Sequence, residues 1–515
     1  MFENQPKGLW ALALANTGER FGYYTMLAVF LLYLQANFGF ETGLASTIYS
    51  TFLMMVYFLP IIGGIAADKF GFGRMVTTGI FIMFIGYLVL SLPLGKDTVA
   101  ITAMGASLIL IALGTGLFKG NLQVMVGRLY DEPKYSQNRD SGFSLFYMAI
   151  NIGAMFAPTA AIKIMKWAQD TMHVSVEDSY HFAFAVACVS LIVSIAIYYI
   201  FSFTYKHVLA SETKKKDDKT PAKEVNELSP AETKERIVCL CLVFAVVIFF
   251  WMAFHQNGQS LTWFARDYTQ STAEGWSRIG FNIWALALIA TSVYTLFGIF
   301  QSEKASGKVG CGVVTAVLWC GAYAIFRGLP NPLEIQPQLF QQFNPFFVVA
   351  LTPVSMAIFS ALAAKKTAKH PEGMEPSAPK KIGIGMLVAA CGYLVMIFAS
   401  IGQPSPASLN GTVAPDPVVP MYLIGTYLIL TFAELLLSPM GISFVSKVAP
   451  PKYKGLMMGL WFAATAVGNY LSSIPGLLWK KVSLTANWSI LMGLCIAAGV
   501  VMFALLKKLE AATKD

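Results

Sequence analysis

The strongest constraint on this 515-residue chain is a series of apolar runs. Each run of about 20 residues crosses the hydrocarbon layer of a membrane, roughly 30 Å thick, as a helix, because a helix pairs its backbone polar groups within one segment. About fourteen runs are present, with approximate limits 9–35, 43–67, 74–94, 99–127, 141–168, 180–204, 236–266, 281–300, 310–328, 344–364, 381–401, 419–446, 454–480 and 487–508. We therefore predict an all-α, polytopic membrane protein.

Composition excludes several other classes. Charged residues make up 13% of the chain, about half the share in soluble proteins. The 7 cysteines fall inside the apolar runs, so we interpret them as small buried side chains and not as a disulfide framework. The basic residues behind the net charge of +9 are spread over many loops without an aromatic platform, which excludes a nucleic-acid partner.

Lysine and arginine collect on the cytoplasmic side of membrane proteins. If both termini are cytoplasmic, about 27 of the 37 Lys and Arg residues lie in cytoplasmic loops. The connection that carries Lys304 and Lys308 then also lies inside, which supports a helical hairpin at about 281–328. We predict a multi-pass protein of the cytoplasmic membrane with both termini in the cytoplasm.

A charged, proline-bearing stretch at 205–235 divides the chain. Such a composition cannot bury itself, so we interpret the stretch as a cytoplasmic linker. It separates a six-helix bundle at 1–204 from a second bundle at 236–515, which contains the hairpin. Two six-helix bundles plus two extra transmembrane helices are typical of a major facilitator fold, in which substrate binds at mid-membrane.

Ionisable side chains near the middle of apolar runs are the main functional signal. They are Glu19, Arg20, Lys119, His255 and Glu434. A charge at the centre of a membrane helix costs about 2.5 to 3.5 kcal/mol, so these groups should face one another or a wet cavity. With the hairpin set aside, they lie on the first helices of the four three-helix repeats, which line the cavity of this fold. Arg20 and Glu434 have opposite charges in opposite halves, which suits a zwitterion.

Other interpretations stay open. Glu19 and Lys119 could form a purely structural ion pair, and His255 could serve only as a hydrogen-bond partner. An integral membrane enzyme would need a catalytic motif, but the sequence contains no H-E-x-x-H or G-x-S-x-G and no clustered metal ligands. We therefore expect no enzyme activity, no metal and no cofactor. A channel or scaffold would not need opposed charges at the ends of a closed site.

Eight motifs in order resemble one family. They are GERFGYY (18–24), VYFLPIIGGIAADKFG (56–71), GTGLFKGN (114–121), FSLFYMAINIGAM (143–155), FFWMAFHQ (249–256), FNPFFVVALTP (343–353), ELLLSPMGIS (434–443) and GLMMGLWF (455–462). The first resembles the E-x-x-E-R-F-x-Y-Y motif of the proton-coupled oligopeptide transporters, the POT or PTR branch of the major facilitators. The resemblance implies a bacterial symporter that carries di- and tripeptides with protons by alternating access. We expect it to function as a monomer in the lipid bilayer.

The resemblance also implies roles for individual residues. Arg20 and Lys119 match the pair that receives the peptide carboxylate, with Glu19 as their proton-sensitive partner. Glu434 matches the acceptor of the peptide ammonium. The remaining matches are Asn151 and Asn344 for the peptide backbone, Tyr24, Tyr57, Trp251 and Trp461 for the walls of side-chain pockets, and Gly64 and Asp68 for the conformational turn after helix 2.

The chain departs from the family pattern at Asn16, Leu27 and His255, where a Glu, an Arg and an acidic residue are common. Charge balance is kept, but the usual proton circuit is not, so peptide transport without proton coupling stays an alternative. We hypothesise that Glu19 releases its proton when the peptide carboxylate arrives and that His255 modulates this step. Transport of another small solute, such as nitrate, is a second alternative, against which the negative charge of Glu434 argues.

Overall fold

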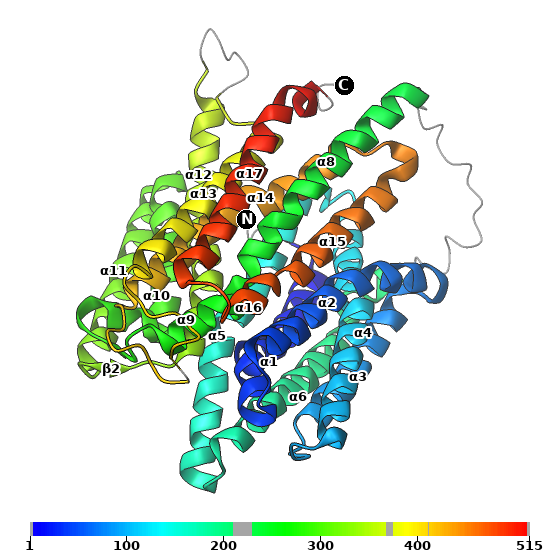
Figure 1. Ribbon diagram of the computed structural model, residues 1–515. Helices are drawn as coiled ribbons and strands as arrows, with labels where there is room; N and C mark the ends of the chain where they lie inside the picture. The colour runs from blue at the N-terminus through cyan, green and yellow to red at the C-terminus, as the bar shows by residue number, and fades with distance from the viewer. Residues whose placement is uncertain (1–3, 210–228, 367–373, 410, 512–515) are drawn as a thin grey trace. The chain divides into compact units, whose positions relative to one another are not determined.

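The computed structural model describes residues 4–209, 229–366, 374–409 and 411–511. This part of the chain is almost entirely helical (Figure 1). The long helices are α1 (Lys7–Phe38), α2 (Thr42–Phe70), α3 (Phe72–Leu90), α4 (Thr98–Arg128), α5 (Arg139–Met172), α6 (Val176–Ile200), α8 (Pro230–Phe254), α10 (Ile283–Gln301), α11 (Ala305–Gly328), α12 (Phe343–Ala364), α13 (Ala378–Ala399), α14 (Met421–Val448), α15 (Lys454–Leu471) and α17 (Leu484–Ala511). Each predicted run overlaps one of them, so the all-α prediction is confirmed.

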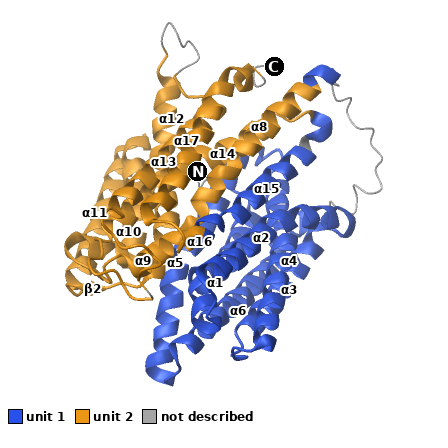
Figure 2. Ribbon diagram, in the orientation of Figure 1, with its two compact units in different colours: residues 1–232, 451–477 blue, residues 233–450, 478–515 orange. Residues whose placement is uncertain are grey.

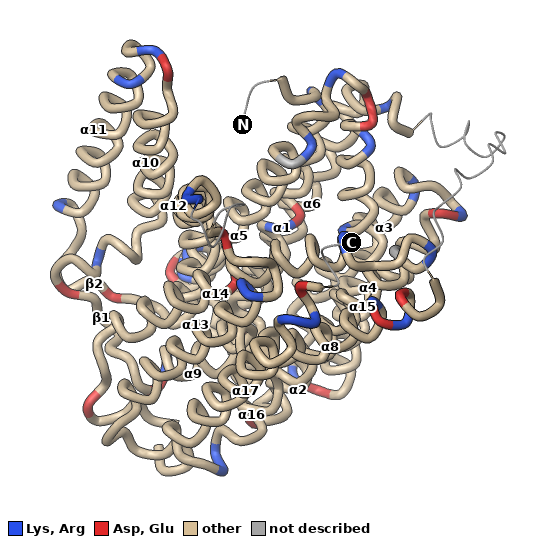
Figure 3. Tube along the Cα trace, turned by 90° about the horizontal axis from the view of Figure 1, so that it is seen from above, with Lys and Arg blue, Asp and Glu red and all other residues tan. Residues whose placement is uncertain are grey.

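Twelve helical segments of the described residues are long and apolar enough to cross a membrane. The predicted spans outside this set are α1 and α15, which have 32 and 18 residues. Charged residues lie mostly near helix ends and connections, with long uncharged stretches of chain between them (Figure 3). The cysteine prediction was wrong in part, because Cys241, Cys320 and Cys391 are exposed in this protein-only structure. All seven cysteines are free.

The described residues form two compact units (Figure 2). Unit 1 comprises the described part of 1–232 together with 451–477, and unit 2 comprises that of 233–450 and 478–515. In unit 1, α2 and α4 pack so closely that a Cβ atom on Gly63 would lie 2.1 Å from the carbonyl oxygen of Gly116. Glycine is therefore required at position 63, whereas a Cβ atom on the predicted turn residue Gly64 would meet nothing within 4 Å.

Helix α8 begins inside the stretch predicted as a linker. Residues 210–228 of that stretch lie outside the described residues, but Ser229 caps a helix that starts at Pro230. The Ser229 hydroxyl accepts from the amide of Glu232 at 3.2 Å, and the Glu232 carboxylate accepts from the amide of Ser229 at 2.9 Å. This reciprocal capping box, with proline at the first helical position, places the helix start six residues before the predicted 236.

The run predicted as one helix at 236–266 is interrupted. Helix α8 ends at Phe254, a 3₁₀ turn η3 (His255–Gly258) follows, and α9 (Ser260–Asp267) resumes. The break frees backbone carbonyl groups, which need partners inside an apolar bundle. The hydroxyl of Tyr393 donates to the carbonyl of Ala253, and that of Tyr427 donates to the carbonyl of Asn257 at 2.9 Å.

Helices α10 and α11 lie where the hairpin was predicted, at about 281–328. The Thr295 and Thr315 hydroxyls are hydrogen-bonded at 2.7 Å, and Tyr294 donates to the carbonyl of Val349 in α12 at 2.9 Å. Two short strands flank the hairpin, β1 (Thr272–Ala273) before it and β2 (Leu333–Glu334) after it. They pair antiparallel, with Ala273 opposite Leu333.

The segment 451–477 clusters with unit 1, although it follows the linker in sequence and was predicted to belong to the second bundle. It contains α15 and the short helix α16 (Ile474–Leu478), and its contacts are with α2. The Ser50 and Ser472 hydroxyls lie 3.0 Å apart, and Ser46 donates to the carbonyl of Ser473 at 3.4 Å. All of these residues are buried. The contact surface between α2 and the end of α15, which we call the seam, is therefore held by small polar side chains.

The seam predicts a specific cross-link. In a variant without the seven native cysteines and with a protease site in the 205–235 stretch, Ser50→Cys with Ser472→Cys should form a disulfide under mild oxidation, because the two hydroxyl oxygens already lie 3.0 Å apart. After cleavage, the fragments should run as one band on a gel without reductant and as two bands with it. Ser50→Cys alone is the control. Two bands under both conditions would contradict the packing of α15 on α2.

Candidate functional site

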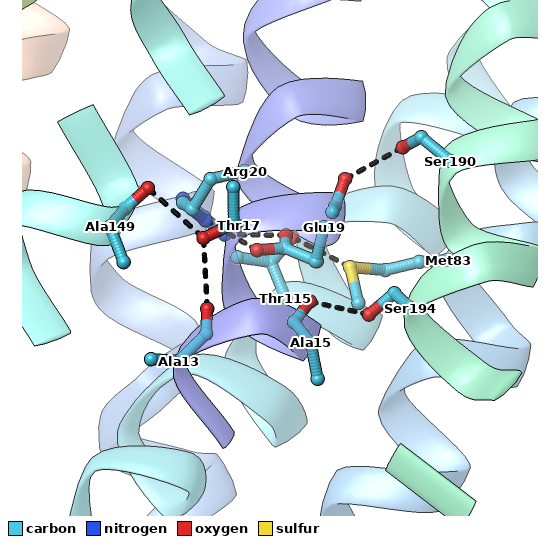
Figure 4. Close-up of polar contacts among 11 residues, drawn as sticks. Ala13, Ala15, Thr17, Glu19, Arg20, Met83, Thr115, Ala149, Ser190 and Ser194 are labelled. Carbon is cyan, nitrogen blue, oxygen red and sulfur yellow. Dashed lines mark hydrogen bonds and ion pairs between the residues drawn. The ribbon is translucent and has the colours of Figure 1, made fainter. Parts of the chain in front are cut away.

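Glu19 and Arg20 form a buried bidentate ion pair in α1 (Figure 4). Arg20 Nη2 donates to Glu19 Oε1 at 2.5 Å, and Arg20 Nε donates to the other carboxylate oxygen. The two residues are only 1% and 3% exposed. A charge buried this deeply is tolerable when its hydrogen-bonding groups are satisfied, and the fork of the guanidinium fits both oxygens of the carboxylate. Both oxygens of the Glu19 carboxyl group therefore have the same guanidinium as their partner.

Hydroxyl groups fix the part of α1 that carries this pair. Ser190 of α6 donates to the carbonyl of Gly18 at 2.7 Å, and Ser194 donates to that of Ala15 at 2.5 Å. On the α5 side, Thr17 donates to the carbonyl of Ala149 at 3.1 Å. These contacts surround the ion pair in Figure 4 and join α1 to its two main neighbours in unit 1. The position of the pair is thus set by side chains that carry no charge.

Lys119 of α4 is held by an aromatic ring. Its ammonium nitrogen lies 4.0 Å from the centroid of the Tyr57 ring of α2, a cation–π contact. The arrangement differs from the Glu19–Lys119 ion pair considered from the sequence, because Glu19 is paired with its neighbour in the chain. Arg20 also lies over an aromatic ring, that of Tyr23, at 4.7 Å. Sequence reasoning missed Tyr23, although it stands beside the predicted Tyr24.

The other predicted residues of unit 1 occupy varied positions. Tyr24 is half-buried and meets the Tyr23 ring edge-on at 5.1 Å. Asn151 of α5 is 7% exposed, and its amide donates to the carbonyl of Tyr147 in the same helix at 3.0 Å. Trp461 is buried in α15 and so belongs to unit 1. Asp68 is exposed near the end of α2, as a turn residue should be.

In unit 2, Asn344 joins two residues of α14. Its amide nitrogen donates to a carboxylate oxygen of Glu434 and to the hydroxyl of Thr431, both at 3.0 Å. Glu434 is 8% exposed. Thr431 lies three residues before Glu434, on the same face of the helix, and sequence reasoning missed it. The sequence signal that could have identified Thr431 is its hydroxyl group, one helical turn before the acid Glu434. This triad gives Glu434 a fixed orientation with neutral partners.

Trp251 and His255 form a stack at the end of α8. Their ring centroids lie 5.6 Å apart with an interplanar angle of 25°, and Phe254 meets both rings edge-on. His255 is the first residue of the 3₁₀ turn, so its backbone no longer follows the α-helix. The structure therefore brings together Glu19 with Arg20, Lys119 with Tyr57, Asn344 with Glu434, and Trp251 with His255. These are two groups, one in each unit.

Removing one partner of the Glu19–Arg20 ion pair should destabilise the protein, and removing both partners should restore most of the lost stability. Glu19→Ala leaves the guanidinium of Arg20 buried without its partner, which should lower the free energy of unfolding by about 3 to 5 kcal/mol. The double variant Glu19→Ala with Arg20→Met removes both charges and should recover most of this loss. Thermal unfolding in detergent measures both effects. Glu41→Ala, which changes an exposed acid, serves as the control. A double variant as unstable as Glu19→Ala would contradict the prediction.

The chain is similar in sequence to several known transporters. The chain is 27% identical to the uncharacterized transporter YclF of Bacillus subtilis, over 100% of this chain and 96% of the relative. It is 26% identical to the peptide transporter YePEPT of Yersinia enterocolitica, over 99% and 96% of the two chains. It is 24% identical to a di-/tripeptide transporter of Lactococcus lactis, over 98% and 96%.

Solved structures share the fold. A peptide transporter POT in complex with sulfate superposes with a TM-score of 0.72 at 23% identity and covers 100% of this chain and 97% of its own. A POT family transporter in complex with 5-aminolevulinic acid gives 0.72 at 20% identity, with coverage of 99% and 98%. The family model for PTR2, described as the POT family, matches residues 74–226 and 316–490, more than half of the sequence. The chain therefore belongs to the POT family of multi-pass membrane transporters.

Proposed function

We propose that the protein is a proton-coupled symporter of di- and tripeptides in the cytoplasmic membrane of a bacterium. The observation that carries this proposal is the chemistry of the two buried groups. Unit 1 offers the cations Arg20 and Lys119, and unit 2 offers the acid Glu434, which accepts from the amide of Asn344. A free peptide has one carboxylate and one ammonium whatever its side chains, so a promiscuous site should recognise these two ends. Peptide transporters among the relatives support the same substrate.

The carboxylate end is assigned to Arg20 and Lys119. The aromatic face of Tyr57 attracts the ammonium of Lys119 without neutralising its charge, so this cation remains suited to an anionic ligand. Arg20 contributes the planar fork that binds carboxylates in two parallel hydrogen bonds. To use it, the peptide must compete with the carboxylate of Glu19, which now occupies the fork.

The ammonium end is assigned to Glu434. A carboxylate has about four acceptor positions, and the amide of Asn344 fixes its orientation from one side. Neither the Asn344 amide nor the Thr431 hydroxyl adds a positive charge beside the negative charge of Glu434. This charge favours a peptide ammonium and disfavours nitrate or another small anion as cargo.

The proton step is assigned to Glu19. The sequence alone suggested that Glu19 releases a proton as the peptide carboxylate arrives. The bidentate pair favours the opposite order, because Glu19 is already charged and held by Arg20. When the peptide carboxylate draws Arg20 away, the buried carboxylate loses its main partner and takes up a proton. Return of Arg20 after peptide release then expels that proton, which couples the two fluxes.

His255 is assigned a modulating role at most in this step. Its imidazole ring stacks on Trp251, and it is the first residue of the 3₁₀ turn. These contacts give His255 a role in packing besides its ability to titrate. We further propose that both termini are cytoplasmic, as the Lys and Arg distribution indicates. Since each residue assigned to substrate lies in one chain, a monomer suffices for function.

The substrate assignment is tested by counterflow of a labelled dipeptide in proteoliposomes. Lys119→Met should reduce exchange about 10- to 100-fold, because it removes a charge-assisted hydrogen bond worth about 1.5 to 3 kcal/mol. Glu434→Gln should reduce exchange of free dipeptides more than that of N-acetylated ones, which have no ammonium. Lys308→Met, which changes a lysine at the hairpin tip, is the control. Full exchange by a correctly inserted Lys119→Met variant would remove Lys119 from carboxylate binding.

The coupling assignment is tested by measuring pH-driven accumulation beside counterflow. Glu19→Gln should keep counterflow, since a neutral amide mimics the protonated acid, and should lose accumulation. His255→Gln should keep both activities if His255 only modulates the step. Accumulation by Glu19→Gln at the wild-type rate would show that the proton takes another route, and loss in His255→Gln alone would move the proton site to His255.

A further inference from the structure

Among the described side chains of unit 1, two buried hydrogen-bond donors have no hydrogen-bond partner. They are the side-chain amide nitrogen of Asn16 and the hydroxyl of Tyr87. Asn16 is 3% exposed and Tyr87 is fully buried. Buried donors in folded proteins are nearly always hydrogen-bonded, so two unused donors in one helical bundle call for an explanation.

Both donors flank the Glu19–Arg20 pair. Asn16 precedes Glu19 by three residues and Arg20 by four in the continuous helix α1, which places the three side chains on neighbouring positions of one face. Tyr87 lies in α3 one helical turn after Met83, which is among the residues drawn around the pair in Figure 4, and it interacts electrostatically with Glu19 and Arg20. The donors thus approach the pair from two helices.

In the present structure neither donor is needed, because Arg20 donates to both oxygens of the Glu19 carboxylate. The situation changes once Arg20 binds a peptide carboxylate. Glu19 is then the only acid in the middle of α1, buried in an apolar bundle and short of donors. A carboxylate in that state must either take a proton or accept hydrogen bonds from other groups.

We propose that Asn16 and Tyr87 are reserve donors to Glu19, positioning residues that hydrogen-bond its carboxylate while Arg20 is engaged with the peptide. The proposal rests on the proposed proton step. It gives the donors a defined effect: by stabilising the charged carboxylate they oppose protonation of Glu19, and so set the pH below which peptide binding loads the proton. The two residues need not touch the peptide.

Few other titratable groups face Glu19. From α4 comes Lys119, which lies over Tyr57 of α2. From α6, Cys188 lies near Tyr87. The part of α5 beside α1 contributes none, since residues 141–162 contain no charged side chain. The group therefore combines one acid, Glu19, with the cations Arg20 and Lys119 and the two neutral donors.

The test compares Tyr87→Phe and Asn16→Leu, each of which removes one donor with little change in volume. Tyr49→Phe is the matched control, because Tyr49 is an equally buried tyrosine of the same unit, in α2. Two readouts are needed in proteoliposomes: dipeptide counterflow at fixed pH, and the external pH at half-maximal peptide uptake. Counterflow in the wild-type protein tests the proposed function independently, so its failure cannot be confused with failure of the reserve donors.

We expect each variant to keep counterflow within about twofold and to move the half-maximal pH upward by about one unit, with a larger shift in the double variant. Tyr49→Phe should match the wild type. Glu19→Gln should lose pH-driven accumulation, so in this background counterflow is measured over the same pH range, and adding either donor substitution should leave its pH dependence unchanged, which a merely structural role for the donors would not produce. An unshifted pH profile with counterflow intact would overturn the proposal, and so would a shift that persists without Glu19. If Tyr87→Phe does not fold, Asn16→Leu applies the same criterion alone.

Discussion

The buried bond between Glu19 and Arg20 is the interaction on which the rest of the site depends. Two charges in an apolar bundle are stable only while each satisfies the other, and the fork of Arg20 now does this for both carboxylate oxygens. Any anion that binds Arg20 must therefore create an unpaired acid one residue away. In the mechanism that we propose, binding of the substrate carboxylate to Arg20 and protonation of Glu19 are coupled through one exchange of hydrogen-bond partners, without a chain of further proton-carrying groups.

Much of the architecture could be predicted because a helix that crosses a membrane must consist mostly of apolar residues, and such runs are visible in the sequence. The fourteen helices and the hairpin follow from apolar length, and the ionisable residues inside them were conspicuous for their cost. Which charge pairs with which could not be predicted. Glu19 has two basic neighbours in space, and the choice of Arg20 over Lys119 depends on side-chain rotamers and on the ring of Tyr57, which periodicity does not report.

Breaks and helix starts were missed for a different reason. The apolar run across His255 is continuous, so nothing in its hydropathy marks the 3₁₀ turn, and the partners that stabilise the break, Tyr393 and Tyr427, come from distant helices. The start of α8 was readable, since Ser229, Pro230 and Glu232 form a capping signature, but the surrounding charge suggested a linker. Thr431 was likewise visible as a hydroxyl one turn from Glu434, yet only the position of Asn344 gives it a role.

The pairing of β1 with β2 has a consequence for the history of the chain. Because Ala273 stands opposite Leu333, and the amide of Ile335 donates to the carbonyl of Ser271 at 2.8 Å, the chain leaves for α10 and returns from α11 at nearly the same place. An element whose two ends lie side by side can be inserted or deleted without moving the segments on either side of it. The hairpin thus leaves the chain and rejoins it as one self-contained element.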